Sequence, residues 1–147
     1  MGPLALRFVI AAVVGIAALT ANAGLRAEPA QEGDAQQVRS VIVTQLLAFA
    51  DNDADGAFET TTPEVRDAVG SAVIFLTMVR HAYPMIYQPA SVTFVRAELL
   101  GDAVVQLVEI IDGQAKSWLA LFLLERQPDA SWLISGYTVA ENRWVSI

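Results

Sequence analysis

The sequence predicts an α+β domain in which N-terminal helices pack on one face of a four-stranded antiparallel sheet. Apolar residues recur at three- and four-residue steps as far as Pro84, as they do in helices, and the period changes to two from Ser91 onward. The later apolar runs are joined by short loops containing Gly, Asp and Pro, which favour antiparallel hairpins. Helices followed by an antiparallel meander are typical of α+β domains.

The first 23 residues are predicted to be a secretory signal peptide. One early cation, Arg7, precedes the apolar run Phe8–Leu19, and Ala21-Asn22-Ala23 is a small-x-small cleavage site. We therefore expect cleavage after Ala23, a periplasmic or secreted protein, and no stable membrane insertion after cleavage. The alternative is an uncleaved N-terminal membrane anchor, because residues 8–25 carry no charge.

Composition excludes several classes of site and partner. The chain has no cysteine, so disulfides, thiolate metal sites and a cysteine nucleophile are absent. Removal of Arg7 with the signal peptide leaves 9 − 1 = 8 cations against 16 anions, a net charge of −8. A surface this acidic repels nucleic acid and anionic lipid, so no nucleic-acid partner is expected.

Residues 24–36 are polar and are predicted to be a flexible leader before a single domain of residues 37–147. Asp34 is expected to cap the first helix, because its short acceptor side chain can satisfy free amide groups. The apolar residues of this helix fall on one face, which also carries one amide side chain. They are Val38, Val41, Ile42, Leu46 and Phe49, with Gln45 among them.

The acidic stretch after this helix begins like a calcium loop, with Asp51, Asp53 and Asp55 at alternate positions. The bidentate carboxylate that such a loop needs at its twelfth position is replaced by Thr62. We therefore interpret the stretch as a polar turn whose carboxylates cap a helix or begin one, and we expect no metal site. A genuine calcium site is the alternative.

Two further helices are predicted from their end signals. Thr62 is expected to cap a helix that begins at Pro63 and stops at Gly70. Ser71 is expected to cap the next helix, which ends at Pro84.

Four strands are predicted at residues 91–99, 103–111, 116–126 and 131–139. A two-residue turn at Gly101-Asp102 would pair Leu99 with Val104, Ala97 with Gln106 and Val95 with Val108. An even-length turn at Asp112 would add Ser117, Leu119, Leu121 and Leu123 to the same face. We expect this face to pack against the helices.

The opposite face of the sheet would then be unusually apolar for a solvated surface. It would carry Phe94, Leu107, Trp118 and Phe122. An exposed patch of this kind marks an interaction site, so we expect a homodimer through this face, with Trp118 near the centre. The competing account is that the C-terminal tail folds back and covers the patch with Trp144 and Val145.

Three stretches of the sequence resemble a known family. They are residues 38–58, residues 75–94 and residues 124–139, and their most specific features are Gln45, Ala57-Phe58, Met78-Val79-Arg80, Tyr83-Pro84, Trp132 and Ser135-Gly136. The chain resembles a bacterial family of exported proteins catalogued as domain of unknown function 4864. The resemblance implies the nuclear-transport-factor-2-like, or cystatin-like cone, fold, in which a curved sheet wraps around a long helix. It implies no catalytic residues, because the family has none established.

The candidate ligand-binding residues are amide and aromatic side chains near the expected interior. Gln45 and Gln106 would point into the cone, where a buried amide must be hydrogen-bonded. Both glutamines could alternatively satisfy local backbone groups. Tyr83, Tyr87 and Arg80 could close the mouth of a pocket. His81 is placed either as a ligand-binding or basic residue or as a cation at a helix C-terminus.

We expect an exported, noncatalytic small-molecule-binding or interaction module without a cofactor. The alternative is a small pocket enzyme, isomerase- or dehydratase-like, that acts on an uncharged organic molecule. The fold itself supports either function.

Overall fold

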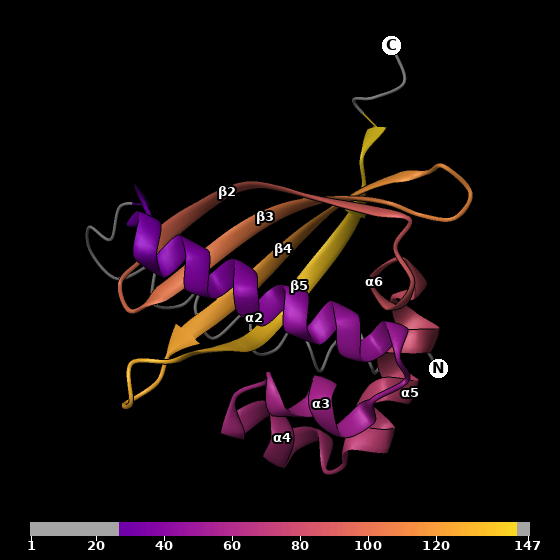
Figure 1. Cartoon of the computed structure of the whole chain (residues 1–147), viewed down its shortest axis with the longest axis horizontal. Coiled ribbons are helices and arrows are strands. Elements are labelled where there is room, and N and C mark those ends of the chain that lie inside the picture. Colours follow the sequence, from indigo (N-terminus) through magenta and orange to yellow (C-terminus); the bar gives the residue numbers. More distant parts are fainter. Residues whose placement is uncertain (1–26, 144–147) are drawn as a thin grey trace.

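The structure is a computed structural model that describes residues 27–143. The predicted signal peptide with its cleavage site and the predicted tail contacts of Trp144 and Val145 lie outside the described residues. Within them, the predicted α+β architecture is confirmed, with helices on one face of an antiparallel sheet (Figure 1). The sheet has five strands in the order β1-β2-β3-β4-β5, one more than predicted.

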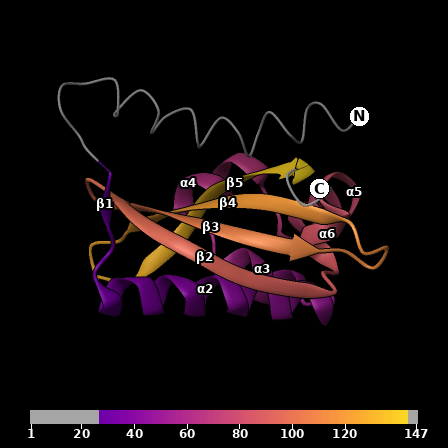
Figure 2. The same ribbon diagram turned by 90° about the horizontal axis from the view of Figure 1, so that it is seen from above.

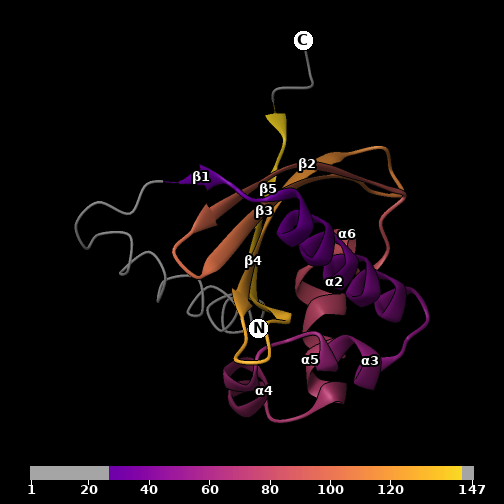
Figure 3. The same ribbon diagram turned by 60° about the vertical axis from the view of Figure 1, so that its left-hand side comes forward.

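The main strands are β2 (Ser91–Leu100), β3 (Ala103–Ile111), β4 (Ser117–Arg126) and β5 (Trp132–Glu141). The long helix α2 (Glu32–Ala50) lies along one face of the sheet, as Figure 2 shows from above. The smaller helices are α3 (Ala54–Glu59), α4 (Pro63–Val69), α5 (Ala72–Ala82) and α6 (Pro84–Tyr87). In Figure 3 the sheet bends over α2 and α6, so that both lie on its concave side.

The predicted helix signals are confirmed by the backbone contacts. The Thr62 hydroxyl accepts a hydrogen bond from Val65 N (3.3 Å), and the Ser71 hydroxyl accepts one from Ile74 N (3.1 Å). Gly70 has φ 93°, a left-handed conformation that ends α4.

The N-terminal boundary differs from the prediction. Residues 24–36 were expected to form a flexible leader, but Glu28–Pro29 forms β1, which pairs with β2, and α2 already begins at Glu32. Asp34 is therefore not the cap of this helix. It lies in the first turn of α2 and accepts a hydrogen bond from Arg126 Nη2 (2.9 Å), so it ties the helix to the end of β4.

The first hairpin begins as predicted and then departs from the predicted register. Gly101 has φ 60°, and Leu99 pairs with Val104 across the turn. A β-bulge between Phe94 and Arg96 then shifts the register, so Phe94, rather than the predicted Val95, pairs with Val108. Phe94 consequently packs against the core, and Val95 is displaced outward, 52% exposed.

The second hairpin reverses the predicted faces of β4. Its loop has five residues, Asp112–Lys116, and Ile111 pairs with Ser117. Asp112 Oδ1 accepts from Lys116 N (2.9 Å), and Asp112 Oδ2 accepts from Trp118 Nε1 (2.9 Å). These bonds hold the loop in this geometry. The loop is one residue longer than predicted, and this shift moves every side chain of β4 to the other face of the sheet.

The prediction that Phe94, Leu107, Trp118 and Phe122 form an exposed interface is therefore wrong for three of these four residues. Phe122 is fully buried in the core, and Phe94 and Trp118 pack partly buried against it. Leu107, which alternates with buried Gln106 and Val108, is the one member of the set on the outer face. The outer face is nevertheless apolar, because the shift moves other large side chains onto it. They are Leu119, Leu121 and Leu123, which join Val105, Leu107 and the displaced Val95 there.

The turn between α3 and α4 pairs with part of the free edge of β5, at Ile134. Thr62 N donates to Ile134 O (3.0 Å), and Ile134 N donates to Thr60 O (2.8 Å), so this turn extends the sheet by one short parallel bridge at Thr61. Covering an edge removes unpaired backbone groups that would otherwise pair with another chain.

Candidate functional site

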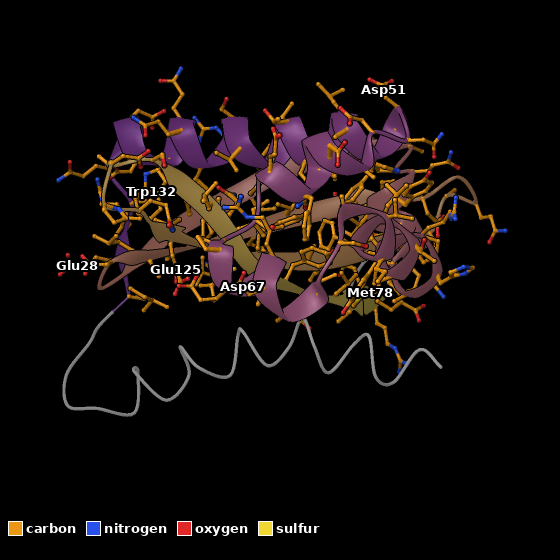
Figure 4. The ribbon with its side chains drawn as sticks, turned by 90° about the horizontal axis from the view of Figure 1, so that it is seen from below. Glu28, Asp51, Asp67, Met78, Glu125 and Trp132 are labelled. Carbon is orange, nitrogen blue, oxygen red and sulfur yellow. The ribbon has the colours of Figure 1, made fainter. Side chains whose placement is uncertain are left out.

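The candidate site lies in the packed interior between the helices and the concave face of the sheet. Gln106 of β3, Phe122 of β4 and Tyr137 of β5 form one cross-strand row on this face, since each is the register partner of the next. Tyr83 reaches the row from the junction of α5 and α6. In Figure 4 side chains fill the space between α2 and the sheet.

The two tyrosines form the centre of the site. Their rings meet edge to face, with centroids 5.0 Å apart, and Phe122 lies 5.3 Å from Tyr137. Both hydroxyl groups are buried, and neither has a hydrogen-bond partner within residues 27–143. Burial raises the pKa of Tyr83 to about 12. Burial, and next the proximity of Tyr83, hold the pKa of Tyr137 well above its ordinary value, so both phenols are neutral donors at physiological pH.

Gln45 joins α2 to the turn that follows α3. Its Nε2 donates to Thr60 Oγ1 (2.9 Å), while Thr60 Oγ1 donates to Ala57 O (2.6 Å). These two consecutive hydrogen bonds fix the orientation of the amide, because the threonine hydroxyl donates its only proton to Ala57 O and can only accept from Gln45. The local, structural role predicted for this glutamine is therefore present. Its Oε1 remains buried and without a partner among the described residues.

Gln106 has a similar arrangement on β3. Its Nε2 donates to Arg96 O (2.9 Å) and Leu107 O (2.9 Å), so the side chain occupies the β-bulge of β2. Both partners are carbonyls, which again fixes the amide orientation. Gln106 Oε1 is buried and unpartnered in the described part of the chain.

The other predicted ligand-binding residues divide into two groups. Tyr87 is buried, with its ring 6.1 Å from that of Phe49, and the Arg80 guanidinium lies 6.0 Å from the Tyr87 ring. His81 is exposed, so the structure does not bring it into the interior. Gln45, Tyr83, Tyr87 and Gln106 are thus the predicted residues that reach the core, with Arg80 at its rim.

Tyr137 is the site residue that sequence reasoning missed. It lies on the concave face because β5 carries an extra residue, Ser135, opposite the step from Leu123 to Leu124. A bulge of this kind is not visible in a period-two pattern. The available signal was the tyrosine itself, a polar-tipped side chain within an otherwise apolar strand, which needs a partner when buried.

Two further buried donors lack partners among residues 27–143, namely Trp132 Nε1 and Arg66 Nε. Trp132 lies at the opposite end of the sheet from Asp51 and Met78 (Figure 4), and the Arg126 guanidinium covers its ring at 4.6 Å.

The acidic turn has the capping role predicted for it. Asp53 Oδ1 accepts from Gly56 N (3.0 Å) and caps α3, and Asp55 lies in the first turn of that helix. Among the described residues, no group of three or more His, Asp or Glu side chains is placed to hold a metal ion. Over the same range, no helix is both long and apolar enough to cross a bilayer.

Comparisons with known proteins agree with the fold. The family model described as Domain of unknown function (DUF4864) matches residues 31–147. No curated protein matches the chain.

Two solved structures are similar to the chain. One is an NTF2-like protein of unknown function from Silicibacter pomeroyi DSS-3, with TM-score 0.53 and 15% identity, covering 77% of this chain and 99% of that one. The other, from Streptomyces avermitilis, is described as a candidate dehydratase of the NTF2-like family, with TM-score 0.47 and 12% identity, covering 76% and 97%. At these identities the first likeness establishes the NTF2-like fold and nothing about activity.

Proposed function

The chain belongs to the family described as Domain of unknown function (DUF4864), and we propose that it is a noncatalytic module that binds a small molecule between α2 and the concave face of the sheet. The predicted signal peptide makes the periplasm or the exterior its proposed place of action. One observation carries the proposal: the hydroxyls of Tyr83 and Tyr137 and the carbonyl oxygens of Gln45 and Gln106 are each buried without a partner in the described chain.

Unpartnered buried polar atoms are costly, which is why they point to a ligand. Each such group costs about 1–3 kcal/mol of desolvation, and native proteins contain few of them. A bound molecule with matching donors and acceptors would recover this cost. Apolar interiors with a few convergent polar groups are the usual form of small-molecule sites.

A noncatalytic role is favoured by the kind of titratable group in this interior. The buried titratable side chains of the described residues are tyrosines. Burial raises the pKa values of Tyr83 and Tyr137 above their ordinary range. A general base works best with a pKa near the operating pH, so neither group suits proton transfer at neutral pH.

The proposal predicts that an apolar probe binds in the interior. Ethylbenzene titrated into the full chain, followed by amide chemical shifts, is expected to give saturable changes centred on β3, β4 and β5. Ala120 is fully buried between Trp118 and Phe122 on the concave face, and Ala120→Leu fills the interior at a cost of about 1–3 kcal/mol of overpacking. This variant is expected to lose the response.

Ala140→Leu is the matched control, because Ala140 is exposed on the same sheet. It should bind ethylbenzene as the wild type does. If Ala120→Leu retains the native circular dichroism spectrum and still binds with unchanged affinity, the interior is not the binding site.

We also propose that a second copy of the chain covers the outer face of the sheet. Val95 and Leu121 are 52% and 40% exposed there, beside the half-buried Leu107 and Leu119. Burying a large apolar side chain contributes about 1.5–3 kcal/mol before association costs, so about four of them from each copy would support a dimer. A twofold axis lets one patch meet its own copy.

Leu121→Glu is accordingly expected to dissociate the dimer. Sedimentation of the full chain at tens of micromolar would then change from dimer to monomer, since a charge cannot be buried without a partner. Leu47→Glu is the control, because Leu47 is 61% exposed on α2, away from the sheet's outer face. A wild type that sediments as a monomer contradicts this proposal without affecting the interior site.

A further inference from the structure

The hydroxyl groups of Tyr83 and Tyr137 form a pair of donors in the interior. Their rings are in edge-to-face contact, and both oxygens are fully enclosed. Each phenol carries one proton to donate, and neither is used in the described chain. Two unused donors on rings that are in contact suit an oxygen acceptor, which has two lone pairs.

The surroundings of the pair exclude a charged ligand. The buried polar side chains of the described residues are amides and hydroxyls, and Arg66 of α4, whose Nε is buried, is only half-buried as a residue. An ion brought into such an interior would lose its hydration without a counter-charge, at a cost that neutral groups do not repay. The ligand must therefore be uncharged.

The walls of the site favour an apolar body for the ligand. Phe122 adjoins Tyr137, and both belong to a core cluster that also contains Phe49 and Phe75. Rings of this kind pack well against flat apolar molecules. The two glutamines use their amide N–H groups within the protein, so they offer only acceptor oxygens.

From these observations we infer that the ligand is an uncharged, largely apolar molecule with a carbonyl, ether or hydroxyl oxygen that accepts hydrogen bonds from Tyr83 and Tyr137. The inference rests on the proposed interior binding function and specifies its ligand class. It assigns Tyr83 and Tyr137 as the residues that select for the acceptor.

Three probes of similar shape test this assignment on the full chain. Acetophenone has a carbonyl acceptor, ethylbenzene lacks one, and benzoate carries a charge. Acetophenone is expected to bind about tenfold more tightly than ethylbenzene, the effect of one to two neutral hydrogen bonds, and benzoate is expected not to bind. The carbonyl stretching band of bound acetophenone is expected to shift to lower wavenumber.

Phenylalanine variants identify the donors. Tyr83→Phe and Tyr137→Phe should each weaken acetophenone binding severalfold, and the double variant should bind acetophenone no better than ethylbenzene. The carbonyl band should return toward its position in an apolar solvent. Thr138→Val is the control, since Thr138 adjoins Tyr137 on β5 but pairs with Leu121 of the outer face, and it should bind acetophenone as the wild type does. Circular dichroism verifies that each variant is folded.

The two possible failures are distinguishable. If ethylbenzene and acetophenone both fail to bind, interior binding is wrong, and this inference falls with it. If both bind equally and the tyrosine variants leave both affinities unchanged, the interior binds small molecules but the tyrosine pair does not select an acceptor. Benzoate binding as tight as that of acetophenone would overturn the requirement for a neutral ligand.

Discussion

Phe122→Ala is expected to lower the free energy of unfolding by about 3–5 kcal/mol, the usual cost of removing a fully buried aromatic ring and leaving a cavity. Phe122 is 0% exposed, contacts Tyr137, and stands between Gln106 and Tyr137 in the concave row. This loss is a large fraction of the about 5–15 kcal/mol that stabilises an ordinary domain. Urea unfolding followed by circular dichroism measures it.

Leu121→Ala is the matched control, because Leu121 immediately precedes Phe122 and is 40% exposed on the outer face. Its cost should be about 1 kcal/mol or less at submicromolar chain concentration, where association does not contribute. The comparison also tests the register of β4. A larger loss for Leu121→Ala than for Phe122→Ala would mean that β4 faces the other way.

Raising the pH above about 10 is expected to destabilise the protein strongly through Tyr83 and Tyr137. Burial raises the pKa of Tyr83 from 10.0 to about 12 and that of Tyr137 well above 10.0. A group whose folded pKa is raised contributes stability that is fully present below its unfolded pKa. That stability is lost as the pH rises through the folded pKa, because the unfolded chain releases its phenolic protons first. The loss should therefore begin near pH 10.

The measurement is the free energy of unfolding as a function of pH, with tyrosinate absorbance recorded in parallel. The tyrosinate forms of Tyr83 and Tyr137 should appear together with unfolding rather than before it. Tyr137→Phe should lose less stability than the wild type above pH 10, because it lacks one of the two groups. Leu121→Ala, which removes no titratable group, should retain the slope of the wild type. Tyrosinate formation of all tyrosines near pH 10 in the folded protein would contradict the burial of the pair.

The sequence by itself determined the helix ends and the first turn of the sheet, because these features depend only on residues that are close together in the chain. Thr62, Pro63 and Gly70 define α4, because a cap needs only an acceptor three residues before a free amide and a stop needs only a residue that tolerates positive φ. Gly101 likewise predicts its own turn and the pairing of Leu99 with Val104. The α+β class and the inward side of α2 follow from periodicity.

The register of the sheet beyond its first turn could not be predicted from the alternation of apolar and polar residues. Both faces of β3 and β4 are apolar, so alternation does not say which face is inside. The choice depends on the bulge at Val95 and on the five-residue loop that Asp112 holds by bonding Trp118 Nε1. These features are stable because they place large rings beneath the helices, a long-range reason that no local window contains.

The candidate site divides in the same way. Gln45, Gln106 and Tyr83 could be identified from the sequence, because a polar side chain on an apolar face must be buried or paired. That Tyr83 meets Tyr137, which lies 54 residues later (137 − 83 = 54), depends on the bulge at Ser135 and on the packing of the α5–α6 junction against β5. The sequence by itself indicated Gln45, Gln106 and Tyr83 as polar groups of the interior, but it did not indicate Tyr137. The tertiary structure alone decided which of them meet, because side chains from separate elements converge only when helices and sheet pack.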